Sequence, residues 1–123
     1  MQAPPIQYAS TPRGDIAYRT LGEGPRDLLL MNPMSRSIEN LWDYPANAAL
    51  LARLAGFCRL TVFDRRGCGI SDPLPADLPP TWEDWLEDVS AVLDHLGIRD
   101  AALLAERDAA AAALLFASSH PER

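Results

Sequence analysis

The stretch Phe63–Pro73, with the sequence FDRRGCGISDP, joins a short apolar run to a segment rich in Gly, Pro and Asp. The run Cys58–Phe63 has the length and apolar content of a buried strand, and Asp64 closes it. The two glycines that follow allow the chain to turn sharply, and Asp and Ser side chains can bind nearby backbone groups. We therefore predict a strand that leads into a structured turn and then into a loop that continues to Pro80.

Further strands are predicted on both sides of this stretch. Ile6–Ser10 and Ile16–Leu21 alternate apolar and polar residues around turn residues, which is the pattern of a β-hairpin. Leu28–Met31 is a continuous apolar run, typical of a strand buried on both faces. Ala101–Ala105 is predicted as one more strand.

Three helices are predicted between and after these strands. The clearest one follows Thr81, because Thr81 and Asp84 have the spacing of a capping box, apolar residues recur at helical spacing, and Gly97 ends the pattern. The acidic residues of this helix are expected on its solvated face: Asp84, Glu87, Asp88 and Asp94.

The other two helices lie on either side of that one in the sequence. The first follows Pro45, with Leu50, Leu51 and Leu54 on one face and Gly56 as a left-handed stop. The last covers Ala109–His120. A hairpin followed by alternating strands and helices predicts an α/β fold with a largely parallel sheet and helices on both faces.

Length and charge narrow the class of protein. The 123 residues are enough for one domain, and the net charge of −6 argues against nucleic-acid binding, which needs cations. Cys58 and Cys68 form no CxxC or Cys/His pattern, so neither a metal nor a cofactor is expected. No leader-like segment and no apolar run of membrane length is present, and we expect a cytoplasmic protein that does not contact a membrane.

The stretch Phe63–Pro73 closely resembles the DxRGxGxSDP segment of α/β-hydrolases, where it is a structural loop. Ile6–Gly24 resembles the first hairpin of that family, Thr81–Gly97 its helix B, and Leu114–Ala117 the helix behind its nucleophile. The chain is most similar to the hydrolase-like N-terminal domains of bacterial class III adenylate cyclases and related regulators. The resemblance implies that residues 1–123 are a single truncated domain, the N-terminal half of an α/β-hydrolase-like sheet.

The residues that catalyse hydrolysis in that family are not matched here. The family carries Ser within G-x-S-x-G on a strained turn, whereas Ala105–Ala109 has Arg107 at the Ser position and Ala at both glycines. A guanidinium is neither a nucleophile nor a base. Since Ala disfavours a tight elbow, we expect Asp108 to cap a simple helix and Arg107 to be solvated.

The other catalytic roles are also unfilled in this sequence. Asn32-Pro33 stands where the family has a Gly-containing turn, and Pro33 has no N–H to donate to an oxyanion. The family's acid and base come later than Arg123 in chain order. His95 and His120 are interpreted as structural or solvated. Cys68 has neighbouring arginines that can lower a thiol pKa, but no evident His partner.

We therefore predict a protein that is not an enzyme: a degenerate hydrolase-like module for association or regulation, either a dimerisation or a sensor domain. One alternative is a fragment of a true esterase-like hydrolase or one half of a split enzyme. A second is a module that binds a small anionic ligand between Asn32 and Arg107.

The association hypothesis predicts a homodimer. If no further strand pairs with Ala101–Ala105, its open edge favours pairing with a second copy. The expected contacts are Leu103 on that strand and, on the following helix, Ala109, Ala112 and Ala113.

Overall fold

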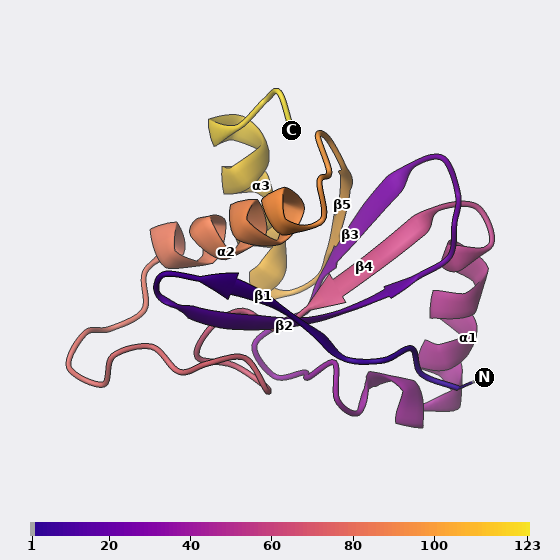
Figure 1. Ribbon diagram of the computed structural model, residues 1–123, viewed down its shortest axis with the longest axis horizontal. Coiled ribbons are helices and arrows are strands. Elements are labelled where there is room, and N and C mark those ends of the chain that lie inside the picture. The colour runs from indigo at the N-terminus through magenta and orange to yellow at the C-terminus, as the bar shows by residue number, and fades with distance from the viewer. Residues whose placement is uncertain (1) are drawn as a thin grey trace.

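Five strands form one mixed sheet in the order β1-β2-β4-β3-β5 in the computed structural model, which describes residues 2–123 (Figure 1). The strands are β1 (Gln7–Thr11), β2 (Gly14–Leu21), β3 (Asp27–Met31), β4 (Arg59–Phe63) and β5 (Ala102–Ala105). All five predicted strands are present, with their ends shifted by one or two residues.

The strand directions match the predicted hairpin followed by a parallel sheet. The hairpin β1–β2 is antiparallel, and β2 also pairs antiparallel with β4. In contrast, β3 lies parallel to both β4 and β5, with Leu30 opposite Val62 on one side and Leu104 on the other. Within residues 2–123, β5 has one strand neighbour, so its other edge is open.

The helices cover both faces of the sheet, as predicted. Helix α1 (Pro45–Ala55) lies on one face, while α2 (Trp82–His95) and α3 (Asp108–Ser119) lie on the other (Figure 1). The α2/α3 face buries a core that includes Trp85 and Phe116. The α1 face buries a second core, which includes Trp42 of the short 3-10 helix η1 (Leu41–Asp43). Two separate apolar cores therefore hold the sheet between them.

The predicted ends of α2 are confirmed, whereas the predicted end of α1 is not. The capping box of α2 is formed: the Thr81 hydroxyl accepts the N–H of Asp84, and the Asp84 carboxylate accepts the N–H of Thr81. Gly97 follows the end of the helix, as predicted, and it is left-handed, with φ of 66°. Gly56 is not, because its φ of −68° continues the helical conformation and its N–H still bonds to carbonyls of α1. The prediction of a left-handed stop at Gly56 was wrong.

The predicted orientation of two helix faces also needs correction. Leu51 is buried in the α1 core, but Leu50 is 55% exposed, because successive helical residues point about 100° apart. On α2, Asp88 is buried and not solvated as expected. Its carboxylate accepts the backbone N–H of Arg66 at 2.7 Å and pairs with the buried Arg66 guanidinium. This ion pair fastens α2 to the loop after β4.

Candidate functional site

The turn from β5 into α3 retains the sharp geometry of a nucleophile elbow. Arg107 has φ of 57° and ψ of −133°, and it is the only non-glycine residue among residues 2–123 with a positive φ. Such a conformation costs about 1–3 kcal/mol for a side-chain-bearing residue. Ala105 and Ala109 do not adopt a positive φ, so the two alanines do not prevent the turn. The expectation that alanines disfavour the elbow was therefore wrong, since the strain falls on Arg107 itself.

The Arg107 side chain is exposed, as predicted. In the described part of the chain, no ion pair or hydrogen bond engages its guanidinium. A permanently protonated guanidinium cannot attack an ester or accept a proton from water. The elbow therefore presents a fixed positive charge where the resembling family presents a nucleophile.

Asp108 does not cap α3, which corrects a second expectation at the elbow. It is the first residue of the helix, and Arg107 occupies the cap position without a side-chain hydrogen bond. The Asp108 carboxylate accepts the backbone N–H of Met34, at 3.2 Å. Pro33 has no N–H, so Met34 supplies the next donor of this loop, and Asp108 already occupies it. An oxyanion would have to compete with a carboxylate for that donor.

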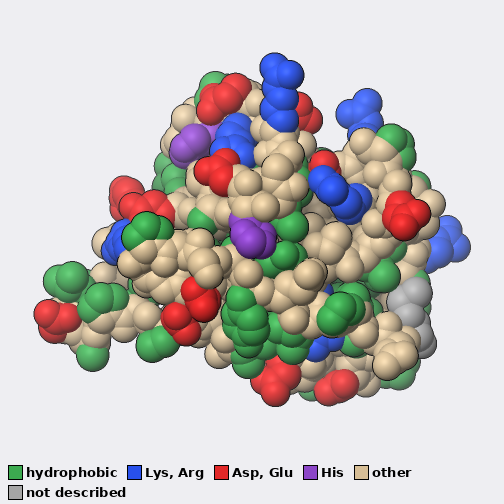
Figure 2. All heavy atoms as spheres, viewed as in Figure 1, with side chains coloured by type: hydrophobic (Ala, Val, Ile, Leu, Met, Phe, Trp, Pro, Cys, Tyr) green, Lys and Arg blue, Asp and Glu red, His purple; other side chains and the backbone are tan. Residues whose placement is uncertain are grey.

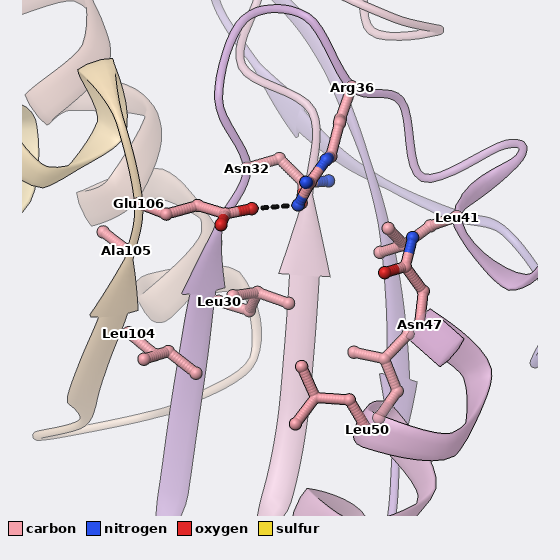
Figure 3. A pocket seen from close by; sticks show the side chains of 10 residues that line it. Leu30, Asn32, Arg36, Leu41, Asn47, Leu50, Leu104, Ala105 and Glu106 are labelled. Atoms are coloured by element: carbon pink, nitrogen blue, oxygen red, sulfur yellow. Dashed lines mark hydrogen bonds and ion pairs between the residues drawn. The ribbon is translucent and has the colours of Figure 1, made fainter. Parts of the chain in front are cut away.

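A hollow of about 240 Å³ lies beside the elbow, on the α1 face of the sheet (Figure 3). Leu30 of β3 and Leu104 of β5 line it from the sheet, and Asn47 and Leu50 line it from α1. Its remaining lining residues are Asn32, Arg36, Leu41, Leu51, Ala105 and Glu106. Apolar side chains dominate this wall, as is usual for sites that bind small molecules.

The two residues predicted to bind an anionic ligand are not brought together in this hollow. Asn32 lines it, but among the described residues Arg107 does not. The guanidinium at its mouth belongs to Arg36, which forms an ion pair with Glu106 (Figure 3). The sequence interpretation missed Arg36 and Glu106 because they lie 70 residues apart and have no motif in common.

The stretch after β4 is a structural loop, as the resemblance implied. The Asp64 carboxylate accepts the Ser37 hydroxyl and the N–H groups of Ile38 and Ile70. Ser71 accepts the N–H of Ala17 and donates to the Asp64 carbonyl. Burial raises the pKa of Asp64, although the three hydrogen bonds favour its charged form. The hydrogen bonds of Asp64 and Ser71 connect the loops to one another and to β2. Because these bonds occupy their polar groups, the two side chains have a structural role.

Cys68 and the two histidines lie in surroundings that suit a structural role better than a catalytic one. Burial raises the pKa of the Cys68 thiol, and this effect outweighs the nearby Arg65 charge that lowers it. The His95 ring packs edge-on against Tyr18, and the His120 ring stacks on Phe116. Among residues 2–123, no three His, Cys, Asp or Glu side chains gather as metal ligands would.

The predicted dimer contacts divide into buried and accessible residues. Ala109 and Ala112 are fully buried in the core of the chain itself, so they cannot contact a partner as predicted. Leu103 and Ala113 are only partly buried and line a hollow between β5 and α3. Leu114, a large apolar side chain at this hollow, is 74% exposed. Helical geometry explains the correction, because only one stripe of α3 can face away from the core.

The surface of the molecule shows one further apolar projection. The loop between β4 and α2 extends away from the body and carries hydrophobic side chains (Figure 2). Leu78 of this loop is 62% exposed. Trp82, at the start of α2, is also exposed and stacks on buried Trp85 with ring centroids 5.9 Å apart. No helix among residues 2–123 has both the length and the apolar character needed to cross a membrane.

The fold defined by this sheet, its elbow and its two helical layers is that of the N-terminal part of an α/β-hydrolase. A hydrolase from Pseudomonas aeruginosa is 28% identical, with a TM-score of 0.80, and the match covers 96% of this chain and 42% of that one. For an enol-lactonase from Burkholderia xenovorans the identity is 25%, the TM-score 0.81, and the coverage 95% and 43%.

A haloalkane dehalogenase variant from Bradyrhizobium elkanii shares the fold at 22% identity and a TM-score of 0.79, with 96% of this chain and 37% of that one covered. The chain thus spans well under half the length of these solved structures. No protein-family model matches it, and no curated protein matches significantly. Its likeness to hydrolases therefore lies in the fold.

Proposed function

We propose that the protein is a non-hydrolytic α/β-hydrolase-fold module that acts by associating with another polypeptide. The observation that carries this proposal is Arg107, which holds the strained elbow position with a guanidinium exposed to solvent. Selection for esterase chemistry would favour a nucleophile at this point. A charged, non-nucleophilic residue is compatible with the fold but not with acyl transfer.

Within residues 2–123, the edge of β5 that faces away from β3 has no strand partner, which supports association as the mode of action. An edge strand offers unpaired N–H and C=O groups to another chain. On the α3 side of this edge, Leu103 and exposed Leu114 line an apolar hollow. On the α1 side, Leu104 is 40% exposed. A second copy joined edge to edge would cover apolar surface on both faces of the sheet, which favours the predicted homodimer.

Light scattering during size exclusion tests the association. We expect twice the mass of the chain at tens of micromolar, falling on dilution. A monodisperse monomer at the same concentration would contradict the homodimer. The resemblance to cyclase-associated domains adds the proposal that such association regulates an output domain, and it would be tested by fusing the chain to a cyclase domain and measuring activity against dimer content.

The second candidate is a hydrolase segment that works only with further polypeptide. The similarity to an enol-lactonase and other hydrolases supports it, and so does the retained elbow geometry. Here Arg107 would be a replaced nucleophile in an otherwise competent frame. This candidate differs from the first in predicting that a serine at position 107 becomes reactive when the remaining sheet is supplied.

One labelling experiment separates the two candidates. The wild type and Arg107→Ser are treated with a fluorophosphonate probe and with p-nitrophenyl acyl esters, alone and mixed with lysate of the source cell. We expect no label and no hydrolysis above buffer in any sample, because the N–H of Met34 is already bonded to the Asp108 carboxylate and is not free to stabilise an oxyanion. Labelling at position 107, or of wild type at Ser35, Ser37 or Ser71, would revive the hydrolase candidate.

A further inference from the structure

The hollow on the α1 face has the features of a binding site that is independent of the elbow. Its sheet side is formed by Leu30 and Leu104, while Leu50 and Asn47 of α1 face them (Figure 3). Arg107 is not among its lining residues within 2–123. Any ligand held here therefore goes beyond the proposed association, and it does not depend on the chemistry of position 107.

Asn32 is a buried polar residue of this hollow whose side-chain nitrogen lacks a partner among the described residues. Its side chain is at the carboxyl end of β3 and the residue is only 8% exposed. The Nδ2 atom is fully buried and has no hydrogen-bond partner in the described part of the chain. Buried amides almost always find partners, because an unpaired one keeps the full cost of its desolvation. Asn32 also lines the hollow, so a rotation of its side-chain amide would offer this unpaired group to a ligand held there.

The charges at the mouth favour a neutral ligand. Arg36 is already paired with Glu106, so the two side chains together contribute no net charge (Figure 3). A carboxylate or phosphate would have to displace Glu106 from Arg36 and would then lie beside a repelling carboxylate. A neutral amide or hydroxyl can bond to the Asn32 amide, which is both donor and acceptor, without disturbing that ion pair.

We infer that this hollow binds a small neutral molecule with a short aliphatic chain and one amide or hydroxyl head, which Asn32 holds by hydrogen bonds. The aliphatic chain would lie against Leu30, Leu50 and Leu104. The volume of about 240 Å³ exceeds that of an apolar cavity of roughly 150 Å³ that holds benzene, so it has room for a chain of about six carbons. This ligand class replaces the small anion predicted between Asn32 and Arg107.

Nuclear magnetic resonance titration of the ¹⁵N-labelled protein tests the inference, with hexanamide as the probe and hexanoate as its charged counterpart. We expect saturable shifts for hexanamide at the Asn32 side-chain amide and at the backbone of Leu30 and Leu104. Hexanoate should shift the same signals only at concentrations at least tenfold higher. Tighter binding of hexanoate would overturn the neutral ligand class, and no shift with hexanamide up to its solubility limit would overturn the site.

Two leucine variants separate ligand recognition by Asn32 from nonspecific binding. Asn32→Leu keeps the size of the side chain and removes the amide, and it should weaken hexanamide binding by about tenfold, as loss of one buried hydrogen bond does. Asn40→Leu is the matched control, because Asn40 is exposed and does not line the hollow. It should bind like the wild type. Unchanged binding by Asn32→Leu would contradict the inference.

The melting temperature of the Asn32→Leu variant shows whether Asn32 stabilises the free protein or serves to bind the ligand. Because the Nδ2 atom bonds to nothing in the free protein, Asn32→Leu should melt at or above the wild-type temperature. Hexanamide should raise the melting temperature of the wild type and not that of Asn32→Leu. A large drop in melting temperature for Asn32→Leu alone would assign the amide a structural role and overturn its assignment to a ligand.

Discussion

The Asp108 carboxylate lies 3.2 Å from the backbone nitrogen of Met34 and accepts its hydrogen bond, so the first residue of α3 is tied to the loop after β3. This contact joins two segments that surround the catalytic centre in hydrolases of this fold. In this protein the contact gives the backbone N–H of Met34 a hydrogen-bond partner within the chain. It also places a negative charge at the N-terminus of α3, where the helix dipole favours it. The elbow is thus held by interactions that stabilise the fold.

The strain at Arg107 predicts a stabilising substitution. Arg107→Gly should raise the free energy of unfolding by about 1 kcal/mol, because glycine adopts a positive φ freely, although it also gains entropy in the unfolded chain. Arg107→Ala is the control, since it removes the guanidinium but keeps the strain, and it should change stability by less than about 0.5 kcal/mol. Urea denaturation measures both. Equal stability of the two variants would mean that the elbow carries no strain.

The buried ion pair between Arg66 and Asp88 predicts a large loss of stability. Asp88→Ala leaves the Arg66 guanidinium buried without its main partner and should cost about 3–5 kcal/mol. Asp94→Ala is the comparison on the same helix. Asp94 pairs with Arg123 at 2.7 Å but is mostly exposed, so its loss should cost less than about 1 kcal/mol. Similar urea midpoints for the two variants would contradict the importance of burial.

The environment of Cys68 predicts slow and pH-dependent alkylation. Because burial raises the pKa of this thiol, the reactive thiolate is scarcer at neutral pH than in a free cysteine. In the variant Cys58→Ser, the remaining Cys68 should react with iodoacetamide more slowly than glutathione at pH 7. Its rate should keep rising with pH beyond the ordinary thiol range. Reaction faster than glutathione at pH 7 would instead favour a thiol activated by the arginines.

The two sides of α3 predict opposite effects of a charge. Leu114→Arg adds charge to a side chain that is 74% exposed, so the variant should fold normally and shift the dimer toward monomer. Ala112→Asp buries a carboxylate in the α2/α3 core and should unfold the chain. Circular dichroism and light scattering read the two outcomes. A Leu114→Arg protein that stays fully dimeric would place the interface elsewhere.

The elements of the fold could be predicted because their signals are local. The alternation around the first hairpin, the capping box at Thr81 and the glycine at position 97 depend on residues a few positions apart. The alternation of strands and helices indicated an α/β fold, and the resemblance of the FDRRGCGISDP stretch to a hydrolase segment implied the hydrolase type; the structure confirms this fold. The absence of a nucleophile at position 107 was also legible in the sequence itself.

The features that decide the site depend on contacts between distant segments. Asp88 has the spacing of a solvated helix residue, and only the placement of Arg66 beside it makes burial favourable. Ala112 looks available until the packing of α3 against the sheet covers it. Likewise, the ion pair of Arg36 and Glu106 and the unpaired amide of Asn32 arise where three segments meet.

The sequence by itself determined the strands, the helices, their alternation and the chemistry missing at the elbow, because periodicity and side-chain type act within a few residues. Only the tertiary structure decided that the elbow keeps its strained turn despite two alanines, since β5 pairs within the sheet while α3 packs against its face, and Arg107 between them takes the positive φ. A residue's burial and its partners are properties of the assembled chain, and packing can impose a backbone conformation that local preference opposes.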